Sequence, residues 1–157
     1  MAGYDKLTPE GENFFKELEE LMSCEVFVGY QVGASTHKDK KTGEEVDMAE
    51  IAMFNELGTE NSPPRPFLRT AVDENQDKIL RAAVAAVKGL AKEGGSAQKS
   101  LNQLGLFGKG LVQKTIVDGD FVPNAPATIK KKKSDKPLID LAQMRQQVNY
   151  VIKKKGE

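Results

Sequence analysis

The sequence contains no tryptophan, one cysteine and one histidine among its 157 residues. A lone Cys24 cannot form a disulfide within the chain, which fits a reducing compartment. One histidine and one cysteine also cannot supply a zinc site of any usual kind. No apolar run approaches the roughly 20 residues that cross a bilayer, and the N-terminus lacks the hydrophobic stretch of a signal peptide. We therefore expect a soluble protein, made in the cytoplasm without membrane contact, with a mostly aliphatic core.

Side chains suited to catalysis are also scarce. His37 lies among lysines in a polar stretch, whereas general acid–base catalysis needs a group held close to its proton, so a solvated loop histidine is expected. Cys24 has no histidine nearby in sequence and is expected to be a buried structural thiol. The glycine cluster at residues 105–110 lacks the spacing of a phosphate-binding loop. We expect no enzyme activity and no catalytic, cofactor-binding or metal-binding residues.

The net charge is zero, but the two signs are unevenly distributed. Residues 1–60 carry 14 acidic and five basic side chains, whereas residues 61–157 carry nine acidic and 18 basic ones. Such a division predicts opposed faces that could help subunits stack or close into a ring head to tail. The alternative is that both halves are simply solvated surface.

A basic connecting segment is expected at residues 130–136. Clustered lysines can neutralise phosphates, which raises a nucleic-acid hypothesis. No aromatic residue is interleaved for base stacking, so a solvated loop is the favoured interpretation, with passing contact to DNA threading through a ring left open. The basic patch comprises Lys130, Lys131, Lys132, Lys133 and Lys136.

Capping residues and periodicity predict the elements of the first half. Thr8 followed by proline is typical of a helix start, and apolar residues follow at helical spacing. Residues 26–30 are rich in β-branched and aromatic side chains and predict a strand. Residues 33–46 lack apolar periodicity and predict a flexible polar loop. A second helix is expected to begin at Asp47 and end at Gly58.

Two longer helices are predicted in the second half. The first should run from about residue 70 to residue 92 with an apolar face toward the core. The second should cover residues 97–117, and its glycines indicate either a kink or the close approach of another segment. Residues 141–147, capped by Asp140, predict one or two helical turns, and residues 148–152 alternate like a terminal strand. The inward face of the first helix is expected to comprise Val72, Ile79, Leu80, Ala83, Val84, Val87, Leu90 and Ala91.

These elements predict a single α+β domain over residues 1–157. Two long helices should pack on a small, mainly antiparallel sheet formed by the N- and C-terminal strands, with long loops between the elements.

Three segments resemble a known family when taken in their order along the chain. The first is residues 47–59, DMAEIAMFNELGT; the second is residues 64–69, PRPFLR; the third lies between residues 123 and 145. Their order and spacing resemble the small tail-completion, or head–tail joining, proteins of tailed phages and prophages. These include the virion-morphogenesis proteins of Mu-like phages. The resemblance covers nearly the whole chain, from about Val26 to Ile152.

The chain departs from the family at one point. Such proteins often have a Thr-Gly pair after the segment Leu-Ile/Val-Asp, where this sequence has Leu141 and Ala142. Without the glycine, a regular helical turn is favoured there over a tight turn.

The resemblance implies a structural virion protein at the junction between the capsid portal and the tail, assembled in the host cytoplasm. Family members look like ring-forming subunits, commonly sixfold, that cap the tail and dock to the head connector. The implied partners are further copies in a hexameric homo-oligomer, portal-side connector proteins, and tail terminator or tail tube proteins. A tail terminator ring, which ends tube growth, is the closest alternative function, and a small DNA-binding accessory protein is a more remote one.

Candidate interaction residues lie within the matching segments. Prolines stiffen residues 64–69, which could present Arg65 and Phe67 to a partner at low entropic cost. The alternative is that Phe67 belongs to the core and the arginines pair with local acids, just as the polar residues at 55–59 could form a capping network within one subunit. The loop at 33–46 could become ordered only on assembly. The candidate set is Asn55, Glu56, Gly58, Thr59, Arg65, Phe67, Arg69, Asn124, Asp140 and Arg145.

Overall fold

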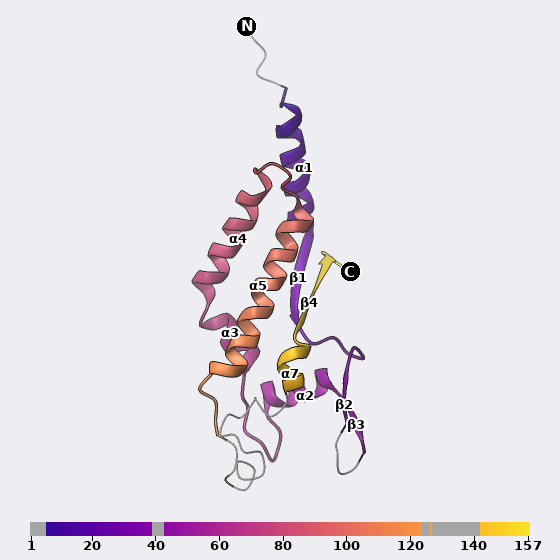
Figure 1. Ribbon diagram of the computed structural model, residues 1–157, viewed down its shortest axis with the longest axis vertical. Coiled ribbons are helices and arrows are strands. Elements are labelled where there is room, and N and C mark those ends of the chain that lie inside the picture. The colour runs from indigo at the N-terminus through magenta and orange to yellow at the C-terminus, as the bar shows by residue number, and fades with distance from the viewer. Residues whose placement is uncertain (1–5, 39–42, 124–125, 127–141) are drawn as a thin grey trace.

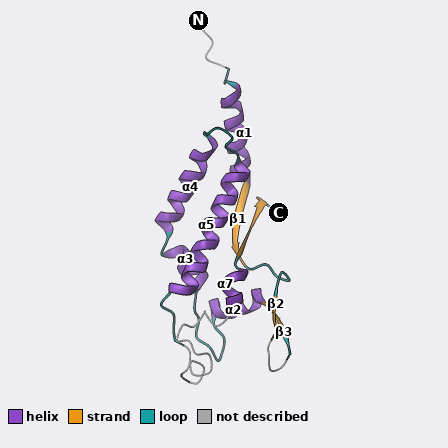
Figure 2. Cartoon of the chain, viewed as in Figure 1, coloured by secondary structure: helices purple, strands orange, loops and turns teal. Residues whose placement is uncertain are grey.

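The computed structural model describes residues 6–38, 43–123, 126 and 142–157. The molecule is elongated: α1 lies at one end, and α2, α7 and the β2–β3 hairpin lie at the other (Figure 1). Helices make up most of it, and the strands lie to one side of α5 (Figure 2). In chain order the elements are α1 (Pro9–Ser23), β1 (Cys24–Gly29), β2 (Thr36–Lys38), β3 (Glu45–Asp47), α2 (Met48–Leu57), α3 (Phe67–Asp73), α4 (Gln76–Leu90), α5 (Ala97–Asp118), α7 (Ala142–Gln147) and β4 (Asn149–Lys154).

The predicted α+β class is confirmed, because helices pack on a small antiparallel sheet that joins both ends of the chain. β1 pairs with β4, with Cys24 opposite Lys154 and Gly29 opposite Asn149. Successive side chains of a strand point to opposite faces. Val28 therefore faces α5, whereas Phe27 lies on the outer face of the sheet, where half of its surface is exposed.

The glycines of α5 allow the sheet to approach this helix closely. A methyl group at Gly108 would lie 2.8 Å from the Val28 side chain, and one at Gly105 would overlap the ring of Tyr150. The helix continues without a break from Ala97 to Asp118. Of the two predicted explanations for these glycines, the structure therefore supports close packing.

Local capping explains where several elements begin and end. Thr8 Oγ1 accepts a hydrogen bond from the Gly11 amide at 3.2 Å, as expected at the start of α1. Asp47 Oδ1 accepts one from the Ala49 amide at 2.8 Å and caps α2. Gly58 ends α2 with φ of 78°, a left-handed conformation that favours glycine.

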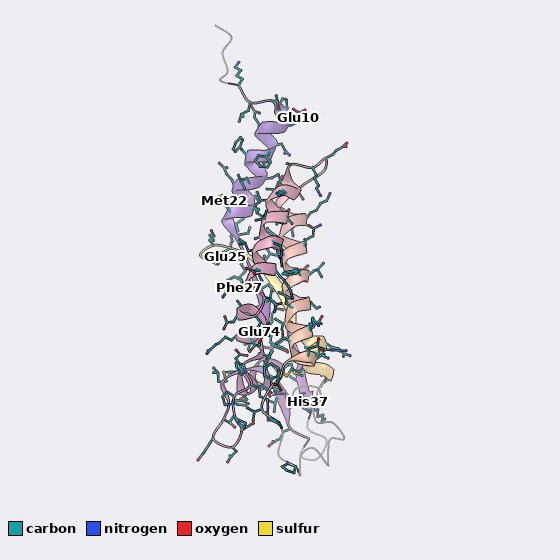
Figure 3. The ribbon with its side chains drawn as sticks, turned by 90° about the vertical axis from the view of Figure 1, so that its left-hand side faces the viewer. Glu10, Met22, Glu25, Phe27, His37 and Glu74 are labelled. Carbon is teal, nitrogen blue, oxygen red and sulfur yellow. The ribbon has the colours of Figure 1, made fainter. Side chains whose placement is uncertain are left out.

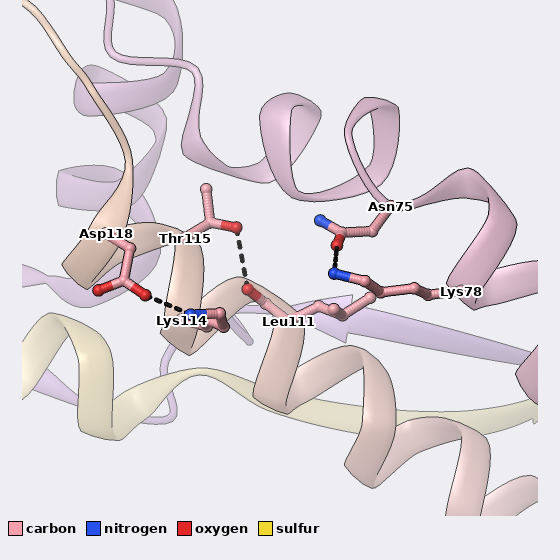
Figure 4. Close-up of polar contacts among 6 residues, drawn as sticks. All are labelled: Asn75, Lys78, Leu111, Lys114, Thr115 and Asp118. Carbon is pink, nitrogen blue, oxygen red and sulfur yellow. Dashed lines mark hydrogen bonds and ion pairs between the residues drawn. The ribbon is translucent and has the colours of Figure 1, made fainter.

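The predicted single helix over residues 70–92 is wrong, because the structure has two helices separated at Glu74 and Asn75. The Asn75 side-chain amide donates to the Ala71 carbonyl at 2.9 Å, the acceptor that a continuous helix would give to the Asn75 backbone amide. Lys78 Nζ donates to Asn75 Oδ1 at 2.8 Å and holds this arrangement from the first turn of α4 (Figure 4). An asparagine that competes for backbone partners thus divides the helix.

Part of the predicted loop at 33–46 is a β-hairpin. Residues 36–38 pair antiparallel with residues 45–47, and His37 lies opposite Val46. The Gly33 amide donates to Asp47 Oδ2 at 2.5 Å, which fastens the base of the hairpin to the start of α2. Strands of three residues are too short to show an alternating pattern in the sequence.

The core lies where α2, α3, α5 and α7 meet. Its largest fully buried side chains are Phe67, Met48, Ile116, Met144 and Val148, so the expected aliphatic character is broken mainly by one phenylalanine. Tyr30 packs edge-to-face on Phe67, with ring centroids 6.2 Å apart. Its hydroxyl donates to the Met144 carbonyl at 2.7 Å, which connects the end of β1 to α7.

Candidate interaction surfaces

The segment with the family-like sequence forms a joint between α2 and α3. Glu56, near the end of α2, accepts hydrogen bonds from the backbone amides of Leu68 at 2.8 Å and Arg69 at 3.0 Å. These amides lie in the first turn of α3, which has no capping side chain of its own. A carboxylate there satisfies donors that the helix leaves free and interacts favourably with its dipole. Glu56 therefore acts within the subunit as the cap of the next helix.

The neighbouring residues of this joint also bond within the chain. The Asn55 carbonyl accepts from the Arg65 amide at 2.6 Å, and the Asn55 side chain donates to the carbonyl one turn earlier. Thr59 and Ser62 exchange two backbone hydrogen bonds of 2.8 and 3.2 Å. A side chain at Gly58 would approach the Pro64 nitrogen to 2.8 Å. These contacts match the capping-network interpretation of residues 55–59.

Arg65 and Phe67 are enclosed by the chain itself. Arg65 is 7% exposed; its Nε donates to the Val122 carbonyl at 3.0 Å, and its Nη1 donates to Ser62 Oγ at 3.3 Å. Burial lowers the pKa of Arg65, although a guanidinium stays charged at neutral pH. Phe67 has no exposed surface. The expectation that this segment presents Arg65 and Phe67 to a partner is therefore wrong for the subunit as it stands: Phe67 is core, and Arg65 ties α3 to the segment after α5.

The remaining candidates separate into two groups. Arg69 and Arg145 are exposed, and the Arg145 carbonyl accepts from Gln113 Nε2 at 3.1 Å. The other candidates, which include the predicted basic patch and the predicted cap of the helix at 141–147, lie outside the described residues. These are Asn124, Asp140, Lys130, Lys131, Lys132, Lys133 and Lys136.

The groups considered for chemistry have ordinary neighbours. His37 lies in β2 rather than in a loop, and its Nδ1 is 2.9 Å from Gln143 Oε1. Cys24 is half-buried, with its sulfur 3.7 Å from the Ser23 hydroxyl. Among the described residues, no three histidine, cysteine or acidic side chains gather in a way that could hold a metal ion. Within the same residues, no helix combines the length and apolar character needed to span a membrane.

The main departure from the sequence prediction is an apolar surface on α3 and α4. Four side chains expected to face the core are largely exposed: Leu80 at 64%, Val72 at 52%, Val84 at 45% and Val87 at 40%. Leu80, Val84 and Val87 follow one another at helical spacing, so they form one continuous flank of α4. We call these four residues the α3–α4 stripe. It is an apolar face of the helices that nothing in the described part of the chain covers.

An apolar groove continues the stripe toward the sheet. Its volume is about 470 Å³, and α3, α4, α5 and β1 all contribute to its walls. Val26 and Val28 line it from β1, Ile79 and Ala83 line it from α4, and Val72 belongs to both groove and stripe. The sheet has only two described strands, so β1 has β4 on one side and no described strand on the other. The groove lies beside that open edge.

A second apolar surface runs along α1 and the outer face of β1. Phe15 is 50% exposed, Met22 is 64% exposed, and they lie seven residues apart, on the same side of α1. Figure 3 shows Met22, Glu25 and Phe27 along one edge of the molecule. We call Phe15, Met22 and Phe27 the ridge. Because Phe27 and the groove-lining valines alternate along β1, the ridge and the groove lie on opposite faces of that strand.

The charges beside these two surfaces differ in their balance of sign. α1 contains five glutamates and one lysine, and Glu12 and Glu19 lie next to the exposed side chains of the ridge. α4 contains three basic residues and one aspartate; Arg81 and Lys88 lie beside the stripe, as does Asp77, three residues before Leu80. The α1 part of the ridge is therefore acidic, and the border of the stripe is mixed with a basic excess. On the β1 part of the ridge, Glu25 lies opposite Lys153. No family model, no curated protein and no solved structure matches the chain.

Proposed function

We propose that this chain is a structural subunit of a tailed-phage particle. In this role it is a tail-completion or neck protein that forms a ring at the head–tail junction and mediates tail attachment. The sequence segments at 47–59, 64–69 and 123–145 support the phage assignment through their resemblance to that family. The proposed partners are further copies of the chain, the portal-side connector proteins, and the terminator or tube proteins of the tail.

The observation that carries an assembly role is the exposed α3–α4 stripe with its groove. Monomeric proteins seldom expose contiguous apolar surface of this kind, and patches rimmed by polar residues are typical of protein interfaces. Here the stripe contains Leu80, which is nearly two-thirds exposed, and charged residues such as Arg81 border it. An apolar centre with a charged border is the usual composition of a protein–protein interface.

The polar residues of the family-like segments have a supporting role in this proposal. Glu56 and Arg65 fix α3 relative to α2 and the segment after α5. A rigid α3 positions Val72, which belongs to the exposed stripe. In this proposal these residues stabilise the fold of the subunit and do not contact its neighbours. No catalytic role is assigned to them.

Deletion of the coding sequence in the phage or prophage that carries it tests the proposal. We expect filled heads and tails of normal length that stay separate, and we expect the purified chain to restore joining when it is added to the lysate. Tails of abnormal length would favour the terminator alternative, because a terminator ends tube growth. Infectious particles with attached tails in the deletion strain would overturn the proposal.

A further inference from the structure

We propose that the ridge of one copy packs into the α3–α4 stripe and groove of the next copy, so that subunits associate head to tail. This inference names the contact surfaces of the proposed ring, and it rests on the chain acting as an assembly subunit. The ridge comprises Phe15, Met22 and Phe27, and the stripe comprises Val72, Leu80, Val84 and Val87.

The two surfaces fit each other in spacing. Phe15 and Met22 are seven residues apart on α1, and Leu80 and Val87 are seven residues apart on α4. Both helices have 15 residues. Apolar side chains seven residues apart, which is about two helical turns, lie on one side of a helix, as side-by-side packing of two helices requires. Large ridge side chains can also enter the groove of about 470 Å³ that adjoins the stripe.

The flanking charges fit in the same way. Glu12 and Glu19 are seven residues apart beside the ridge, and Arg81 and Lys88 are seven residues apart beside the stripe. Contact between ridge and stripe brings these charges together with opposite signs. Contact of ridge with ridge would bring Glu12 and Glu19 of both copies together, and contact of stripe with stripe would bring together two borders with a basic excess; both are less favourable. The charges therefore favour a second copy presenting its other surface.

The position of the two surfaces determines the type of assembly. Phe27 and Val28 are neighbours in β1 but point to opposite faces of the strand, toward the ridge and the groove respectively. An interface between two different surfaces of the same protein is heterologous, and repeated around a closing rotation it generates a ring.

Complementary variants test this contact in the purified chain. Phe15→Glu with Met22→Glu disables the ridge, and Leu80→Glu with Val84→Glu disables the stripe. The matched control is Leu106→Glu on α5, where a side chain that is 59% exposed belongs to neither surface. All five positions are exposed, so folding should be retained, and circular dichroism and thermal unfolding verify it.

Sedimentation velocity and small-angle scattering at concentrations up to about 1 mM provide the readout. We expect oligomers from the wild type and from the Leu106 variant, and monomers from the ridge variant and the stripe variant alone. A mixture of the two should form a one-to-one dimer and nothing larger, because each pair retains one intact ridge and one intact stripe. Wild-type chain that stays monomeric, or variants that still oligomerise, would overturn the inference.

A charge exchange provides an independent test. Glu12→Lys with Glu19→Lys should weaken association by about tenfold, since two attractive pairs become repulsive. Adding Arg81→Glu and Lys88→Glu in the same chain should restore it. Failure of the restoration would show that these charges do not meet.

Cysteine trapping identifies the two faces directly. With Cys24→Ser as background, one chain carries Met22→Cys and another carries Val84→Cys. Oxidation should cross-link the two in a mixture and neither alone; a self-linked single variant would contradict the contact. Trapping that succeeds while the deletion phage still joins its tails would leave the contact intact and reject the phage function. The reverse result would retain the function and reject the contact.

Discussion

Gly105 of α5 lies directly against the aromatic ring of Tyr150 in β4, so closely that a methyl group there would overlap the ring. The Tyr150 hydroxyl continues past the glycine and donates to Asn102 Oδ1 at 2.9 Å. A small residue on the helix and a large one on the strand thus set the distance between the two layers. The same α5 carries Gly110, where an added methyl group would meet nothing.

This difference gives the first prediction. Gly105→Ala should lower the free energy of unfolding by about 1–3 kcal/mol, because the sheet must move away from α5 to relieve the overlap. Gly110→Ala should raise it by up to about 1 kcal/mol, since alanine favours the helix and the space is open. Urea unfolding of both variants measures the two effects. Equal effects at the two positions would contradict the close packing.

The cap of α3 gives the second prediction. Glu56→Ala should cost about 1–2 kcal/mol in unfolding free energy, because two amides of α3 lose their acceptor. Glu56→Gln retains one oxygen acceptor and should cost less. Glu60→Ala, at an exposed position shortly after α2, serves as the control and should stay within about 0.5 kcal/mol of the wild type.

Tyr30 gives the third prediction, which concerns pH. Burial raises the pKa of Tyr30, so the folded chain holds the phenol proton at a pH where the unfolded chain releases it. Below the ordinary tyrosine pKa of about 10, Tyr30 contributes fully to the free energy of unfolding. As pH rises above that value this contribution is lost, by up to about 1.4 kcal/mol per pH unit.

Tyr30→Phe separates this contribution from other titrating groups. The variant should lose about 1 kcal/mol at neutral pH, because the Met144 carbonyl loses its donor. Above pH 10 its stability should fall less steeply than that of the wild type. Denaturant unfolding at pH 8, 10 and 11 compares the slopes, and parallel slopes would show that Tyr30 does not carry the effect.

The fourth prediction concerns ionic strength. If Glu12 and Glu19 of one copy meet Arg81 and Lys88 of the next, association should weaken by about fivefold between 0.1 and 1 M salt, where the screening length falls from about 10 to about 3 Å. It should not disappear, because the apolar side chains of the ridge remain. Light scattering across a salt series measures the change. Complete dissociation at high salt would mean that charge, not apolar contact, dominates the interface.

The sequence predicts those parts of the fold that depend on local chemistry. Thr8, Asp47 and Gly58 sit at helix ends because each supplies a hydrogen-bond acceptor or a backbone conformation that the end requires. The terminal strand was predictable from the alternation of Val148, Tyr150 and Ile152, although β4 itself begins one residue later, at Asn149. None of these predictions needed knowledge of distant residues.

The incorrect predictions share a different cause. The break at Asn75 depends on whether its side-chain amide or its backbone amide donates to the Ala71 carbonyl. The periodicity of apolar residues does not distinguish these two hydrogen bonds. The exposure of Leu80 and Val84 depends on how far the sheet extends over α4, which is decided by strand pairing. An apolar periodic face shows that a helix needs a covering surface, but it does not show which chain supplies that surface.

The candidate site was less predictable than the fold. Residues such as Glu56 and Phe67 stood out because of their type and spacing, yet their contacts are internal to the subunit. The sequence does not distinguish the ridge, because Phe15 and Met22 fit an ordinary amphipathic helix. The signal that could have revealed it is that α1 has more apolar side chains than one inward face of the helix can bury.

The pairing of β1 with β4 has a consequence for how the chain matures. Cys24 pairs with Lys154, so β1 gains its neighbour only after residues 149–154 have left the ribosome. Contacts between such distant positions slow folding and leave early segments exposed in the meantime. A prematurely terminated chain would lack β4, and with it the partner that holds β1 in place. Only chains translated through residue 154 can complete the two-stranded sheet against which α5 packs.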